Sequence, residues 1–193
     1  DAPVTGGDSA VTVEDIEVTI LASDLLSNDT DGDGDSLSLT SVGNAVNGSV
    51  LLDGNGDVVF TPDADFNGVA AFDYSVSDGN GGETTQTVTV TVSPEDDAPV
   101  VSAPATGSLA EDSALVVTTE DLLANATDVD GDTLSVSNLA VVGTDASVID
   151  NGDGTWTISP AGDFNGAVNL SYDVSDGTST VAGSLDVTVA AVN

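Results

Sequence analysis

Apolar and polar residues alternate along most of this chain with a period of two. The clearest case is the stretch 85–92, where threonine or glutamine and valine exchange at almost every step. Successive side chains of a β-strand point to opposite faces, so this period predicts half-buried strands rather than helices. In the first half of the chain the pattern predicts one helical turn at 23–28 and seven strands, near 9–13, 16–21, 36–43, 48–53, 57–61, 69–77 and 84–93.

The same pattern occurs twice. The Asp-Ala-Pro-Val start at 1–4 returns at 97–100, and the Tyr-x-Val-Ser-Asp-Gly stretch at 74–79 returns at 172–177. Such a long repeat period is a whole domain and not a solenoid unit. We therefore predict two domains, 1–96 and 97–193, joined by a linker at about 93–99 that Pro94 and Pro99 keep out of helical conformation.

Seven short strands per copy, separated by turn signals, are typical of a two-layer sandwich. The Asp53-Gly-Asn-Gly-Asp57 stretch is one such signal and predicts a hairpin connection. The predicted fold is all-β: two tandem seven-stranded Greek-key sandwiches of the cadherin or immunoglobulin type, arranged end to end.

The composition excludes most kinds of catalytic and binding site. The chain has 34 acidic residues, no lysine, arginine or histidine, and no cysteine, and its net charge is −34. It therefore has no thiolate, no imidazole and no cationic clamp for phosphate, and it would repel nucleic acid and anionic membrane surfaces. A hydrophobic content of 39% still allows cores to form, but no apolar run is long enough to span a bilayer.

An enzyme is the least favoured of the functions considered. Glycosidases use paired carboxylates, but no single acid here falls in a predicted apolar pocket that would raise its pKa. The chain starts at Asp1 without a signal peptide, and we interpret it as a segment of a longer protein.

The predicted topology gathers the acids at the ends of the domains. Loops of an up-and-down sandwich alternate between its two ends, so the acids at one end of domain 1 are expected to meet the acids at the start of domain 2. The first set is Glu14, Asp15, Asp63, Asp65 and the linker acids Glu95, Asp96 and Asp97, and the second is Asp128, Asp130, Asp132 and Asp176. The counterparts of the second set in domain 1 are Asp31, Asp33, Asp35 and Asp78, at its free end.

So many carboxylates in one place need counter-ions, and clustered hard oxygen ligands favour Ca²⁺ over Mg²⁺. The competing interpretation, that Asp-Gly runs are only turns, is preferred for Asp53, Asp57, Asp150 and Asp153. An EF-hand matches at Asp29, Asp31, Asp33 and Gly34. It fails at its twelfth position, where Thr40 replaces the required glutamate and the flanks are predicted strands.

The combined motifs resemble the cadherin-like repeats of large bacterial surface proteins, including RTX-type biofilm adhesins. The matching features are Glu-Asp, Leu-Leu-x-Asn, the Asp-x-Asp-Gly-Asp run, Phe-Thr-Pro, Phe-Asn-Gly, Tyr-x-Val-Ser-Asp-Gly and the Asp-Ala-Pro-Val linker. The resemblance covers nearly the whole chain twice. It implies calcium between domains, held by Glu14, Asp63 or Asp65, Asp96 or Asp97, Asp128, Asp130 and Asp176.

The resulting hypothesis is a calcium-rigidified extender in an extracellular adhesin on a bacterial cell surface, with neighbouring repeats of the same chain as its partners and no tendency to oligomerise. The alternative is a cadherin-like module that binds surface polysaccharide. Sugar sites usually need an exposed aromatic platform, and Trp156 is predicted to face the core because it aligns with Val58.

Overall fold

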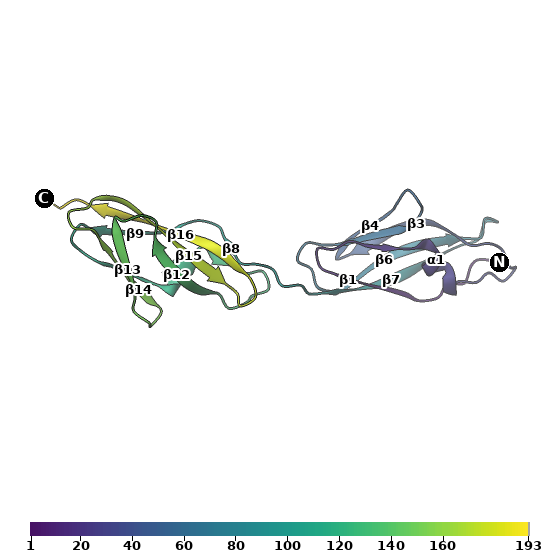
Figure 1. The fold of residues 1–193 in the computed structure, drawn as a ribbon. Helices are drawn as coiled ribbons and strands as arrows, with labels where there is room; N and C mark the ends of the chain where they lie inside the picture. The colour runs from purple at the N-terminus through teal and green to yellow at the C-terminus, as the bar shows by residue number, and fades with distance from the viewer. Residues whose placement is uncertain (193) are drawn as a thin grey trace. The chain divides into compact units, whose positions relative to one another are not determined.

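The computed structural model describes residues 1–192 and forms two compact units, unit 1 (Asp1–Glu95) and unit 2 (Asp96–Asn193). The division falls one residue before the boundary expected from the repeat, so Asp96 belongs to unit 2. Each unit is a sandwich of two sheets, and Figure 1 shows the strands of each in two facing layers.

Unit 1 contains seven strands and one helical turn. One sheet has the order β1-β7-β6-β3 and the other has the order β2-β5-β4. Strand β1 runs parallel to β7, and every other pair is antiparallel. The elements are β1 (Asp8–Val13), β2 (Val18–Ile20), α1 (Ala22–Leu25), η1 (Leu26–Asn28), β3 (Ser38–Val46), β4 (Gly48–Leu52), β5 (Val58–Pro62), β6 (Gly68–Ser77) and β7 (Glu83–Ser93).

Unit 2 repeats this plan and adds one small ribbon. Its sheets have the orders β12-β15-β16-β9 and β10-β14-β13, and the added ribbon pairs β8 with β11. The elements are β8 (Val100–Val101), β9 (Ala105–Ala110), β10 (Leu115–Thr118), α2 (Thr119–Leu123), β11 (Ala126–Thr127), β12 (Ser135–Val141), β13 (Ala146–Asp150), β14 (Thr155–Pro160), β15 (Gly166–Ser175) and β16 (Thr180–Ala190).

The cores follow the alternation in the sequence. In β6, the side chains of Phe72, Tyr74 and Val76 are at most 1% exposed, while the residues between them are half-buried. Their counterparts in β15 are also buried, and Trp156 is 6% exposed. The prediction that this tryptophan faces the core is therefore confirmed.

Two strand boundaries differ from the sequence prediction. The strand expected at 16–21 begins only at Val18, because a turn after Val13 brings the amide of Ile16 to the carbonyl of Val13 at 3.3 Å. The strand expected at 36–43 covers Ser38–Val46, with register shifts on either side of residues 41–43 and a left-handed Asn44 at φ 51°. A bulge lengthens a strand in this way because it places one extra residue opposite its partner.

The strand directions place the loops. Because β1 and β7 are parallel, the β1–β2 turn, the β5–β6 loop and the end of β7 share one end of unit 1. The segment after η1 and the β6–β7 loop lie at the other end. None of the described helices is long and apolar enough to cross a membrane.

Candidate metal centres

Glu14 closes one end of unit 1. Its side chain is only 3% exposed, and one carboxylate oxygen accepts a hydrogen bond from the amide of Glu95 at 2.6 Å. The other oxygen accepts from the Asn67 side chain at 3.4 Å, and the amide of Glu14 donates to the carbonyl of Ser93 at 3.0 Å. Glu14 therefore joins the β1–β2 turn to the chain that leaves β7.

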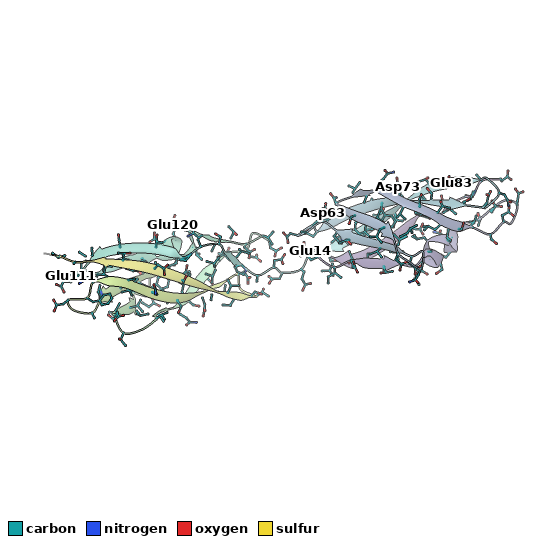
Figure 2. All side chains as sticks on the ribbon, turned by 90° about the horizontal axis from the view of Figure 1, so that it is seen from above. Glu14, Asp63, Asp73, Glu83, Glu111 and Glu120 are labelled. Carbon is teal, nitrogen blue, oxygen red and sulfur yellow. The ribbon has the colours of Figure 1, made fainter. Side chains whose placement is uncertain are left out.

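Asp15 and Asp65 lie at the same end. The amide of Asp65 donates to Oδ1 of Asp15 at 3.2 Å, and both residues are left-handed, at φ 55° and 59°. Figure 2 shows Glu14 and Asp63 at this end of unit 1. Asp63 is exposed, its amide donates to the carbonyl of Asn47 at 3.1 Å, and it belongs to no tight acidic group among residues 1–192. Of the acids predicted at this end within unit 1, Asp63 has the weakest structural support.

Asp31 organises the run at the other end of unit 1. Its Oδ1 accepts hydrogen bonds from the amides of Asp33 at 2.8 Å and Asp35 at 3.2 Å, and ligand oxygens of these three residues lie within 4.8 Å of one another. The bonds from Asp35 and Asp33 hold the pKa of the Asp31 carboxyl below its ordinary value. The second oxygen, Oδ2, is buried and has no hydrogen-bond partner.

Asp78, in the β6–β7 loop, lies at the same end of unit 1 as the Asp31 run. It is 6% exposed, and its Oδ1 accepts from the amides of Asn80 at 2.7 Å and Gly82 at 2.9 Å. The amino group of Asp1 pairs with Asp33, and Asp31, Asp78 and Asp35 also raise the pKa of this amine. Asp78 therefore lies at the same end of unit 1 as the Asp31, Asp33 and Asp35 carboxylates.

Unit 2 builds the corresponding cluster from the same type of Asp-rich run. Ligand oxygens of Asp128, Asp130 and Asp132 lie within 4.8 Å of one another, and the amide of Asp132 donates to Oδ1 of Asp128 at 3.1 Å. The amide of Asp97 donates to Oδ2 of Asp130 at 2.9 Å. The start of unit 2 is thereby tied to its own acidic run.

Asp176 and Asp96 complete this cluster. Asp176 Oδ1 accepts from the amides of Thr178 at 2.7 Å and Ser179 at 2.6 Å. Loss of hydration raises the pKa of the Asp132 carboxyl, and the charges of Asp128, Asp96, Asp130 and Asp176 raise it further. The carboxylates of Asp128, Asp96, Asp130 and Asp176 therefore lie close enough to repel the Asp132 carboxylate.

Unsatisfied oxygens show that these clusters suit a cation. Oδ2 of Asp31, of Asp128 and of Asp176 is buried with no hydrogen-bond partner. A buried anionic oxygen without a donor is unfavourable, and the chain supplies no lysine, arginine or histidine to satisfy it. Oxygen-only ligands in flexible loops suit Ca²⁺, which takes 6–8 of them. The residues present therefore fit calcium.

Three further acids of unit 2, Glu111, Asp112 and Asp163, match Glu14, Asp15 and Asp65 in the repeat, but they were not predicted as ligands because this site was expected to be truncated in the second copy. Glu111 repeats the role of Glu14, because it accepts a hydrogen bond from the amide of Val192 at 2.8 Å and its own amide donates to the carbonyl of Ala190 at 2.8 Å. Asp112 and Asp163 share the left-handed conformation of Asp15 and Asp65. The repeat identifies these acids, since each matches a predicted ligand of the first copy.

Asp53 and Asp150 stabilise hairpin turns, as predicted, whereas Asp57 Oδ1 accepts from the amide of Ala22 at 2.9 Å, outside its turn. Asp53 Oδ1 accepts from the amides of Asn55 at 2.8 Å and Asp57 at 2.9 Å, and Asp150 Oδ1 accepts from the amide of Gly152 at 2.8 Å. Oδ1 of Asp53 and of Asp150 is used inside its own turn, as expected for an aspartate that stabilises a hairpin.

Comparisons with known proteins identify the repeat. The sequence model of a family described as "Cadherin-like domain" matches residues 1–93 and again residues 95–190. No curated protein sequence matches the chain.

Solved structures with the same fold include the EC1–2 fragment of human mucin-like protocadherin, at 16% identity and a TM-score of 0.51, with 98% of each chain covered. Drosophila N-cadherin EC1–4 matches all of this chain and 50% of its own length, at 15% identity and a TM-score of 0.53. An endo-fucoidan hydrolase of glycoside hydrolase family 107 also aligns, at 18% identity and a TM-score of 0.38. The chain spans 29% of that hydrolase, and a TM-score this low supports no conclusion about fold or function.

Proposed function

The chain belongs to the cadherin-like domain family in both of its units, and from this premise we propose that it is a calcium-rigidified extender segment of a bacterial cell-surface adhesin. Cadherin-like domains are typically extracellular adhesion modules, generally bind Ca²⁺ and are generally not enzymes. The bacterial, RTX-type and biofilm assignment rests on the motif set of the two repeats, from the Glu-Asp pair to the Asp-Ala-Pro-Val linker.

One observation carries the calcium proposal. Three carboxylate oxygens, on Asp31, Asp128 and Asp176, are buried without any hydrogen-bond donor. An ion bound there would supply the missing partner, and it would offset the loss of hydration and the carboxylate repulsion that together raise the pKa of Asp132. We propose that Asp31, Asp33, Asp35 and Asp78 hold calcium in unit 1, and Asp128, Asp130, Asp132 and Asp176 in unit 2.

Rigidity follows from where the acids lie in each unit. Glu14, Asp15 and Asp65 close the end from which the linker leaves unit 1, while Asp96 and Asp97 open unit 2. Bound calcium at these segments would limit the freedom of the linker, and a row of such repeats would hold a distal binding domain away from the cell. The partners in this proposal are neighbouring repeats of the same chain, and the protein acts as a monomer.

Thermal unfolding with and without calcium tests this function. An ion that binds only the folded state stabilises it by about 2.7 kcal/mol at a concentration 100 times its dissociation constant. We expect a higher melting temperature in millimolar calcium than in EDTA, and a smaller rise in magnesium. Asp53→Asn, in a turn outside the clusters, should keep the full calcium response. Equal melting curves in calcium and in EDTA would contradict the proposal.

A further inference from the structure

Unit 2 contains a cavity that the acidic clusters do not use. It has a volume of about 390 Å³ and opens between β9, β10 and α2. Ala105, Val117 and Leu185, each at most 5% exposed, form part of its wall, together with Leu115. The space is open to solvent on the α2 side, where Asp121 and Ala124 are exposed, and its volume lies within the range of small-molecule sites.

A comparison with unit 1 explains where the space comes from. Strand β9 pairs with β16 as β1 pairs with β7, and this register places Ala105 where unit 1 has Asp8 and Gly107 where unit 1 has Ala10. In unit 1 the Asp8 side chain reaches the Tyr74 hydroxyl at 2.7 Å. At Ala105 the shorter side chain leaves room that Asp8 occupies in unit 1, whereas the space beside Gly107 is filled by the Leu115 side chain, which would lie 2.7 Å from a Cβ there.

The polar side of the cavity has a fixed negative charge. Asp121 Oδ2 accepts hydrogen bonds from the amide of Thr118 at 2.9 Å and from its hydroxyl at 2.8 Å. Oδ1 accepts none from the described residues. The bonds from Thr118 lower the pKa of the Asp121 carboxyl, so it is ionised at neutral pH. The neighbouring Asn125 is held by its own hydrogen bond to the Pro104 carbonyl at 3.2 Å.

We propose that this cavity binds a small amphiphilic amine, with the ammonium group at Asp121 and the apolar part against Val117 and Leu185. An anion would be repelled by Asp121 and by a protein of net charge −34. A neutral apolar molecule that covered the exposed Asp121 would displace water from Oδ1 without replacing its hydrogen bonds, which is unfavourable for a carboxylate. The chain has no lysine, arginine or histidine, so only a ligand can bring an organic cation to this carboxylate.

The structure supplies a reporter for binding. Trp156 is the only tryptophan, and its register partner across β10 and β14 is Val117, in the cavity wall. A ligand that packs on Val117 should change the emission of Trp156. Hexylammonium is a suitable probe, and hexanol and hexanoate are matched in chain length but neutral or negative.

The experiment is a fluorescence titration of calcium-saturated protein at constant ionic strength, checked by calorimetry. We expect saturable binding of hexylammonium, binding of hexanol that is about tenfold weaker, and no binding of hexanoate. Asp121→Asn should weaken hexylammonium about tenfold while hexanol binds as before, because only the charge is removed. Asp24→Asn, at the corresponding position of unit 1, should change neither.

A second variant tests the apolar part. Ala124→Leu narrows the cavity mouth from α2 and should abolish binding of both hexylammonium and hexanol, while the melting temperature reports whether unit 2 stays folded. The proposal is overturned if hexanol binds as tightly as hexylammonium, if Asp121→Asn and Asp24→Asn weaken the amine equally, or if the amine does not saturate. None of these outcomes depends on the calcium proposal.

Discussion

The two units place the same tyrosine at the same point of the same sheet, but they surround its hydroxyl differently. In unit 1 the Tyr74 hydroxyl donates to Asp8 at 2.7 Å and lies 3.5 Å from Asp29. In unit 2 the Tyr172 hydroxyl donates to the backbone carbonyl of Leu122 at 2.7 Å. Burial and the bond to Asp8 raise the pKa of Tyr74, which therefore remains a donor.

This difference shows that the residues around the buried tyrosine hydroxyl can vary between the two units. Unit 1 holds two carboxylates beside the tyrosine, whereas unit 2 has Ala105 and Ala126 at the matching positions and an open cavity nearby. The alternating apolar residues of the central strands are the same kind in both units, and they are enough to fix the fold. The side chains around the tyrosine, such as those at positions 8 and 105, can then differ while the fold stays the same.

The acidic runs differ in a related way. Backbone donors lower the pKa of Asp31 in unit 1, while burial and neighbouring carboxylates raise the pKa of Asp132 in unit 2. The carboxylate that receives backbone donors is thus stabilised as an anion, while the one crowded by other carboxylates is not. Calcium is proposed to supply the positive charge that such a run lacks.

The largest expected effect is on the core of unit 2. Trp156→Ala should destabilise that unit by about 3–5 kcal/mol because it removes a large buried side chain. Calorimetry should show the unit 2 transition at a lower temperature and the unit 1 transition unchanged. Val58→Ala, at the matching position of unit 1, should shift the other transition. A fully folded Trp156→Ala protein that had lost polysaccharide binding would instead favour a carbohydrate-binding module.

Removing the two tyrosine hydroxyls sharpens the comparison. Tyr74→Phe should cost about 1.5–3 kcal/mol, because the lost hydrogen bond ends on a carboxylate. Tyr172→Phe should cost only about 0.5–1.5 kcal/mol, because its partner is a neutral carbonyl. Chemical denaturation of each variant measures both. Equal losses would show that Asp8 adds nothing to the polar network of unit 1.

The smallest expected effect concerns the carboxyl of Asp73, a half-buried residue of β6. Asp73 accepts from the Thr87 hydroxyl at 2.6 Å and from Asn44 at 2.9 Å, and these bonds lower its pKa below 3.8. A carboxyl with a lowered folded pKa adds stability above its unfolded pKa, and this contribution is lost as the pH falls through the folded value.

Thr87→Val removes the first of these bonds. The variant should therefore be slightly less stable than the parent at pH 7, and the difference should shrink as the pH falls below about 4. Thermal melts across this range measure the difference. Unit 2 is an internal control, since Asp173 pairs with Ala182 and not with a threonine. A difference between variant and parent that did not change with pH would mean that the hydroxyl acts only through packing.

The sequence was enough to predict the strands whose alternation is regular. Strand β7 and the buried side of β6 follow directly from it. It did not predict β8, because a strand of two residues is too short to show an alternating pattern. It also did not predict the bulge at Asn44, which depends on the pairing between β3 and β6.

The candidate site was predictable as a set of acids but not as geometry. The repeat locates the Asp-rich runs, and the predicted topology brings Glu14 close to the exit of β7. Loop conformation decides the rest. It buries Glu14, which accepts a hydrogen bond from the Glu95 amide, and it leaves Asp63 exposed. The cavity of unit 2 was also beyond prediction, since it depends on the small side chain of Ala105, which looks ordinary in a strand pattern.

The most direct test of the calcium-rigidified extender is small-angle scattering of the parent, of Asp130→Ala and of its unit 1 counterpart Asp33→Ala, each in calcium and in EDTA. The parent should have a longer mean end-to-end distance in calcium than in EDTA, because bound ions limit the linker. Asp130→Ala in calcium should resemble the parent in EDTA, whereas Asp33→Ala should resemble the parent in calcium. If both variants stay as extended as the parent, or both shorten alike, calcium does not rigidify the tandem in the way proposed.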